Sequence, residues 1–361
     1  METSNFSGMS GMDDERGWRC MSFKEFREDG VIFADWLPWG ALVKSHLMMN
    51  KDSSLMATFL YNQILVVEDD VMLGAFEKFS EFFKGLGSGW GINVEVQKKE
   101  ERTENREQRI QYYLTFVYLP DRKYKGDGKA VFEKGLLRVR ESFGVLCDLR
   151  LLEGQEYLDY LRSTICFNGS KVEMPEIPMY LDALLTQEIE ISIEDEEAVV
   201  NESAFQVVTP MGFVSENIHE VLSCVNRLGF DYRFVVRFLF MGDADAKKEN
   251  ERYRKTWFQG RRSAMKLLDY PDFEGVFGYY MAAFVVSDSE ELGVRSEGVG
   301  ARRKAERVEG VLNGLGIVTI VEDYNLQDVW FGTIPGMVRS NVFAPILPVH
   351  DVNSLLILPL G

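Results

Sequence analysis

The sequence has few histidines and few cysteines. Its 361 residues include three histidines, His46, His219 and His350, and four cysteines, Cys20, Cys147, Cys166 and Cys224. No two cysteines form a short-spaced pair, so we expect reduced thiols of a cytoplasmic protein rather than a disulfide framework. Three scattered histidines also exclude a His-rich metal site.

Long apolar runs are absent as well. A transmembrane helix needs roughly 18 apolar residues, whereas the longest runs here, 112–119 and 279–286, have the length of a strand. Residues 1–20 carry Arg16 and Arg19 but no apolar core after them. We therefore expect neither a membrane-spanning helix nor a signal peptide.

Basic residues are outnumbered by acidic ones. The chain has 40 Lys and Arg against 57 Asp and Glu, which gives a formal net charge of −17. This excess argues against bulk nucleic-acid binding, because phosphate contacts require clustered basic side chains. It also argues against docking on anionic lipid by charge alone. The 46% of apolar residues is typical of a folded protein, and the length of about two domains.

Apolar periodicity predicts an α+β fold. In the N-terminal half we expect strands at 55–61, 92–96, 111–119 and 145–152 and helices at 71–83 and 130–143. In the C-terminal half we expect strands at 205–209, 232–240, 278–286 and 317–321, helices at 215–228 and 301–313, and an inserted long helix at 244–268. With that helix set aside, both halves have the order β-α-β-β-α-β, which predicts two tandem ferredoxin-like units.

The expected division of the chain follows from these patterns. We predict a disordered extension over 1–20, a first α+β unit over 21–170, a connecting segment with prolines and acids over 171–203, a second α+β unit over 204–335, and a C-terminal segment over 336–361. In the connecting segment the acidic run 194–197 is expected to be a solvated loop. The alternative, a cation site, lacks the spaced ligands that such a site needs.

Known catalytic motifs are missing. The only Gly-Lys pair, Gly128-Lys129, lacks the rest of a P-loop, and the glycines at 85–91 precede a strand instead of following one. His219-Glu220 begins a zinc-protease motif, but Ser223 stands where its second histidine belongs. Cys224 is interpreted as an inert thiol. We therefore assign no catalytic, cofactor-binding or metal-binding residue.

One helix carries a basic and aromatic surface. Arg252, Arg254, Trp257, Arg261 and Arg262 fall within the helix expected at 244–268, and we take them as candidate partner-binding residues. The simpler interpretation is an amphipathic helix with a charged face. A third possibility is a nucleic-acid-binding tandem ferredoxin-like module that uses the basic helix 247–266.

Several stretches also resemble a known family when they are taken in order. They are 35–43 (DWLPWGALV), 50–58 (NKDSSLMAT), 86–95 (LGSGWGINVE), 175–183 (PEIPMYLDA), 230–233 (FDYR), 251–258 (ERYRKTWF), 313–319 (NGLGIVT) and 330–336 (WFGTIPG). Together they resemble the N-terminal region of the CagE/TrbE/VirB family of conjugal transfer and type IV secretion ATPases, with TrbE-like members most similar. The resemblance runs from about residue 21 to residue 361.

The resemblance implies a role as an N-terminal docking and oligomerisation domain of a secretion ATPase. Family members lie at the cytoplasmic face of the bacterial inner membrane, form hexamers, contact other secretion components and support pilus assembly and substrate transfer. Their ATP and Mg²⁺ bind a C-terminal RecA-like domain, which is expected to be missing here. Because no P-loop is present, no catalytic residue of the family is carried over, and we expect no ATPase activity from this chain alone.

Overall fold

The computed structural model describes most of the residues between Phe33 and Pro348. The described ranges are 33–63, 81–83, 85–100, 108–120, 126–144, 147–166, 171–175, 180–193, 198–201, 203–211, 218–242, 244–248, 276–288, 299–337 and 346–348. Within them no helix is long and apolar enough to cross a membrane.

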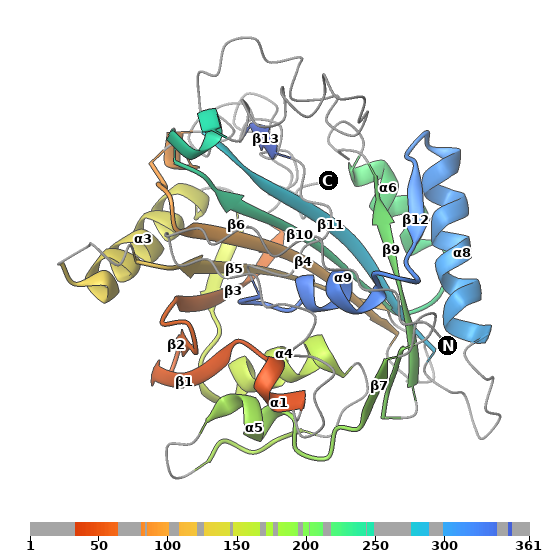
Figure 1. Ribbon diagram of the computed structural model, residues 1–361, viewed down its shortest axis with the longest axis horizontal. Helices are drawn as coiled ribbons and strands as arrows, with labels where there is room; N and C mark the ends of the chain where they lie inside the picture. The colour runs from red at the N-terminus through yellow and green to blue at the C-terminus, as the bar shows by residue number, and fades with distance from the viewer. Residues whose placement is uncertain are drawn as a thin grey trace, which may run out of the picture.

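One large antiparallel sheet organises these residues (Figure 1). Its strands are β1 (Trp39–Lys44), β2 (Leu47–Asn50), β3 (Leu55–Gln63), β4 (Trp90–Glu100), β5 (Gln108–Tyr118), β6 (Cys147–Leu151), β7 (Ile191–Ile193), β8 (Ala198–Val200), β9 (Ser203–Pro210), β10 (Tyr232–Phe240), β11 (Phe277–Ser287), β12 (Thr319–Val321) and β13 (Ile346–Pro348). The main path runs β1-β2-β3-β5-β4-β10-β11-β9-β8-β7, while β6 pairs with β3, β12 with β9 and β13 with β11.

The two halves of the sheet have the same strand order. In the first half β6 pairs with β3, β3 with β5 and β5 with β4. In the second half β12 pairs with β9, β9 with β11 and β11 with β10. The halves meet where β4 pairs with β10, in a register that runs from Tyr232 opposite Lys98 to Leu239 opposite Gly91. We call this β4–β10 pairing the seam.

One face of the sheet is covered by helices from both halves. These are α3 (Gly128–Phe143), α6 (Ile218–Asn226) and α8 (Val299–Gly314), and they share one apolar core with that face. Figure 1 shows α3 at one side of the sheet and α8 at the other. Side chains alternate between the faces of a strand, so Trp90, Ile92 and Val94 of β4 point into this core. Helix α3 begins at Asp127, whose carboxylate accepts from two backbone amides of the first turn.

The opposite face is also covered. Helices α1 (Phe33–Trp36), α4 (Gly154–Ile165), α5 (Leu181–Leu185) and α9 (Leu326–Gly332) lie there and form a second apolar core. In Figure 1, α1, α4 and α5 lie together below the sheet, and α9 crosses in front of it. Trp330 of α9 and Tyr157 of α4 are almost fully buried in this core. The central strands are therefore shielded on both faces.

The predicted α+β class is confirmed, and the eight strands expected from periodicity are present with slightly different bounds. Of the expected helix at 244–268, only 244–248 lies within the described residues, where it is helical, and the expected helix at 71–83 falls mostly outside them. The hairpin of β1 and β2 and the helices α4 and α9 were not predicted. The acidic run 194–197, expected to be a solvated loop, lies outside the described residues, between the paired strands β7 and β8, which were not predicted.

The contact between α3 and β4 gives a stability prediction. A Cβ atom on Gly135 would collide with the ring of Trp90, whereas a Cβ on Gly310 of α8 would meet nothing within 4 Å. We expect Gly135→Ala to lower the free energy of unfolding by about 1–3 kcal/mol, because the overpacking outweighs the gain in helix propensity. Gly310→Ala is the matched control and should raise it by up to about 1 kcal/mol. Urea denaturation followed by circular dichroism measures both changes, and equal changes in the two variants would contradict the described packing.

Candidate functional site

The five candidate partner-binding residues lie outside the described residues. Arg252, Arg254, Trp257, Arg261 and Arg262 all fall within 249–275. The structure does describe where that segment begins and ends. Phe240 of β10 pairs with Gly278 of β11, and the Met241 amide donates to the Phe277 carbonyl at 2.8 Å. The described residues that precede and follow residues 249–275, which we call the basic segment, are therefore joined at one end of the β10–β11 hairpin.

The other residues considered from the sequence show no reactive constellation. The Cys147 thiol is buried, and burial raises its pKa to about 12, so it stays protonated at neutral pH. Cys166 is buried and accepts a hydrogen bond from the Asn201 amide, and Cys224 is half-buried. The acidic run 194–197 lies outside the described residues, between β7 and β8. Among the residues that the structure describes, no group of three His, Cys, Asp or Glu side chains could hold a metal ion.

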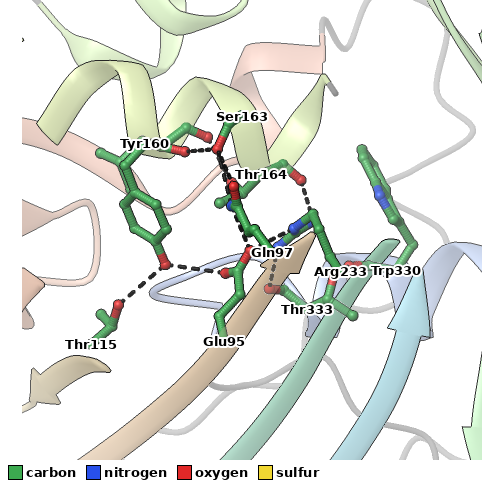
Figure 2. Close-up of polar contacts among 10 residues, drawn as sticks. Glu95, Gln97, Thr115, Tyr160, Ser163, Thr164, Arg233, Trp330 and Thr333 are labelled. Carbon is green, nitrogen blue, oxygen red and sulfur yellow. Dashed lines mark hydrogen bonds and ion pairs between the residues drawn. The ribbon is translucent and has the colours of Figure 1, made fainter. Parts of the chain in front are cut away.

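The most developed polar site is a buried cluster at the seam (Figure 2). It consists of Glu95 and Gln97 on β4, Arg233 on β10, and Tyr160 and Ser163 on α4, and we call it the seam cluster. All five side chains lie on the face of the sheet that α4 and α9 cover. The cluster thus brings together residues from both halves of the chain.

An ion pair lies at the centre of this cluster. Arg233 Nε donates to Glu95 Oε1 at 2.6 Å, and the two side chains are 0% and 1% exposed. The remaining guanidinium nitrogens donate to backbone carbonyls: Nη1 to Thr164 at 2.6 Å and Nη2 to Thr333 at 3.3 Å. Arg233 therefore joins β4 of the first half, the end of α4 and the residue that follows α9.

The Glu95 carboxylate has further partners. Gln97 Nε2 donates to Oε1 at 2.7 Å and the Tyr160 hydroxyl donates to Oε2 at 3.1 Å. Tyr160 in turn lies 3.3 Å from the Thr115 hydroxyl of β5. Burial raises the pKa of Tyr160 well above its usual value, so its hydroxyl keeps the proton that it donates to Glu95. A buried carboxylate needs such donors, because burial removes its hydration.

Arg237 makes a second connection from the seam to α9. It lies on the same side of β10 as Arg233, four residues further along that strand, and is 4% exposed. Its Nη1 donates to the carbonyls of Gly332, at 3.0 Å, and of Met337. Burial lowers the pKa of Arg237 to about 10, which still leaves the guanidinium charged at neutral pH.

This arrangement is suited to holding elements together rather than to chemistry. The Glu95 and Arg233 side chains are shielded from solvent, and their polar atoms are directed at protein partners. The sequence does carry a signal for the cluster. Asn93, Glu95 and Gln97 occupy alternate positions in one apolar strand, and Arg233 and Arg237 share one face of the next. Such polar residues on one side of two buried strands indicate a buried network.

The ion pair gives a double-mutant prediction. Arg233→Met leaves the Glu95 carboxylate buried without its charged partner, and we expect the free energy of unfolding to fall by about 3–5 kcal/mol. Adding Glu95→Leu to that variant should restore most of the loss, because the uncompensated charge is gone. Arg138→Met, at an exposed arginine of α3, is the control and should change little. Urea denaturation measures all of these proteins and the Glu95→Leu single variant, and strictly additive losses would contradict a direct Glu95–Arg233 interaction.

Two acids, the buried Glu322 and the half-buried Asp328 of α9, give a pH prediction. Burial raises the pKa of Asp328 on α9 to about 6, and it raises the pKa of Glu322, which is 1% exposed. Protonation of Asp328 is therefore more favourable in the folded chain than in the unfolded chain. The stability that the protonated group contributes is present below about pH 4 and is lost as the pH rises through 6. Asp328→Asn should remove part of this loss of stability at higher pH. We expect the variant to gain roughly 1 kcal/mol over the wild type between pH 4 and pH 7, since the side chain is only partly buried.

Thermal and urea unfolding at a series of pH values measure this difference. Asp323→Asn is a neighbouring control at a partly exposed carboxyl group. An Asp328→Asn variant whose stability follows that of the wild type at every pH would contradict the described burial of Asp328.

Comparisons with known proteins find similarity to proteins named for conjugal transfer. No family model matches the chain. A conjugal transfer protein TrbE from Rhizobium radiobacter is 21% identical to this chain. The alignment is 426 residues long and covers 93% of this chain and 50% of that protein. A probable conjugal transfer protein TrbE from Sinorhizobium fredii, named as the second portion of TrbE, is 23% identical over 231 residues, which cover 57% of this chain and 33% of that protein.

The chain spans half or less of the length of these curated relatives. The similarity to TrbE of Rhizobium radiobacter nevertheless extends over nearly all of the present sequence. Both relatives are named as TrbE proteins of conjugal transfer, and this chain is similar to them.

Proposed function

We propose that this chain acts in conjugal transfer as a docking and oligomerisation module that supports pilus assembly and substrate transfer. The observation that carries the proposal is the similarity to TrbE, which covers 93% of the chain. The module would work at the cytoplasmic face of the inner membrane, through contacts with other secretion components and with further copies of itself.

We further propose that each half is a ferredoxin-like unit, so that the module is a fused pair. The support is the strand order, which is β6-β3-β5-β4 in one half and β12-β9-β11-β10 in the other. Neighbouring strands are antiparallel in both halves. In each half the first strand along the chain, β3 or β9, lies between the fourth strand, β6 or β12, and the third strand, β5 or β11. The seam cluster then fixes how the two units are joined, which suits a rigid platform on which partners assemble.

Contacts with partners would use the sheet edges and the basic segment rather than the sheet faces. Almost every described side chain of β4 and β10 is buried, because helices cover both faces. Bases need an open face with accessible aromatic rings in order to stack on a sheet. The covered faces, together with the net charge of −17, speak against the nucleic-acid-binding alternative.

ATP chemistry is assigned to another part of the assembly. The sequence contains no P-loop pattern, and such a loop supplies the backbone amides and the lysine that hold phosphates. The module would instead transmit or restrain movements that ATP hydrolysis drives elsewhere, with Mg²⁺ bound beside the nucleotide there.

Self-association of the purified chain tests this proposal. We expect the chain to form oligomers in sedimentation velocity runs and to hydrolyse no ATP above background. Combined Arg252→Ala, Arg254→Ala and Arg261→Ala substitutions should weaken association at least tenfold, or about 1.4 kcal/mol, if the basic segment carries a contact. Arg138→Ala with Arg140→Ala removes two exposed basic charges from α3 and is the matched control.

Three results would count against the proposal. ATP turnover by the purified chain would contradict a docking role without catalysis. Monomers at all concentrations, together with unchanged mating frequency in donor cells that lack the gene, would remove the docking role itself. Binding of labelled single-stranded DNA at low salt that the triple substitution abolishes would favour the nucleic-acid alternative.

A further inference from the structure

Strand β12 lies at an edge of the sheet that the described residues form. Within the part of the chain that the structure describes, it pairs only with β9. The Met211 amide donates to Val318 and the Glu322 amide donates to Val207, at 2.8 and 2.9 Å. Backbone groups alternate in direction along an antiparallel strand. The amides and carbonyls of Thr319 and Val321 therefore point away from β9, toward the outer edge of the sheet.

The composition of this edge favours strand addition. Residues 317–321 read Ile-Val-Thr-Ile-Val, with a β-branched side chain at every position and neither charge nor proline. These residues have the highest tendency to form strands. The Val318 side chain is 67% exposed, and Met211, directly across from it on the β9 side, is 46% exposed. An apolar rim thus lies beside the free backbone groups.

Three other edge strands of the described sheet, β1, β6 and β7, have charged residues on or beside them. Charged side chains on an edge strand prevent pairing with another chain. Strand β6 exposes Asp148 and Arg150, and β1 exposes Lys44. Strand β7 follows the exposed Glu190. Among these described edges, β12 is the one whose strand and preceding residues carry no such charge.

We propose that β12 is a docking edge onto which a partner protein adds an extended segment as the next strand of the sheet. This inference deepens the proposed function and rests on the docking role that it assigns. Main-chain hydrogen bonds to Thr319 and Val321 would supply much of the affinity, and apolar side chains of the segment would cover Val318 and Met211.

Charge identifies the chemistry of the partner segment. Each copy of this chain carries a net charge of −17, which attracts a basic segment, and residues 317–321 of a second copy have no lysine or arginine at either end. The half-buried Asp323 lies two residues beyond the strand and adds an acidic group near this edge. The expected segment is therefore rich in β-branched residues and carries lysine or arginine at its ends, and it belongs to a different protein rather than to a second copy.

Fluorescence anisotropy tests the proposal with a defined probe. The probe is a labelled synthetic peptide in which valine and threonine alternate between two lysines at each end. We expect saturable binding to the full chain, together with slower hydrogen exchange at the Thr319 and Val321 amides. Val318→Lys places a charge on the edge, and Val321→Pro removes one outward amide without removing a bond to β9. Each should weaken binding at least tenfold.

The control is Leu137→Lys, which makes the same kind of change at another exposed apolar residue, 59% exposed on α3. It should bind the peptide as the wild type does. Absence of peptide binding to the wild type, or equal binding by Val318→Lys, would overturn the docking edge. Oligomers that Val318→Lys dissociates would show that a second copy occupies the edge, which would also overturn it. If the peptide does not bind at β12 while the triple arginine variant still loses self-association, the proposed function stands and only the docking edge is wrong.

Discussion

The ion pair between Glu95 and Arg233 is the contact on which the arrangement of the two halves depends. It lies where β4 meets β10, and its guanidinium also binds the end of α4 and the residue after α9. A buried pair of this kind adds little net stability over an apolar core, but it tolerates few alternative arrangements. Its value here is geometric, because the Arg233 side chain connects two strands with two of the helices of the covering layer, α4 and α9.

Two covering layers follow from this arrangement. The helices α3, α6 and α8 occupy the face that the repeated strand order leads us to expect, and they bury ordinary apolar side chains. The opposite face carries the polar seam cluster as well as apolar side chains, so α4 and α9 must supply both hydrogen bonds and packing. With both faces covered, the edges of the described sheet are the part of it that partners could reach.

The sequence predicts the repeated elements well, because local periodicity determines them. Strand β10, for example, is a continuous apolar run interrupted only by Arg233 and Arg237. The second covering layer is harder to predict. Tyr157, Leu161 and Ile165 have helical spacing, yet only tertiary packing determines which sheet face they cover. Likewise, alternation places Glu95 and Arg233 on buried strands, but the pairing of β4 with β10 joins residues 138 positions apart. The candidate basic residues lie outside the described ranges and stay a prediction.

The central claim is that the seam makes one cooperative unit of both halves. Native-state hydrogen exchange of the β4 and β10 amides, measured as a function of denaturant, tests it most directly. If the claim holds, the two strands open together, with the same free energy and the same dependence on denaturant. Opening of β10 at a clearly lower free energy than β4, or the reverse, would show that the halves unfold separately and would contradict the claim.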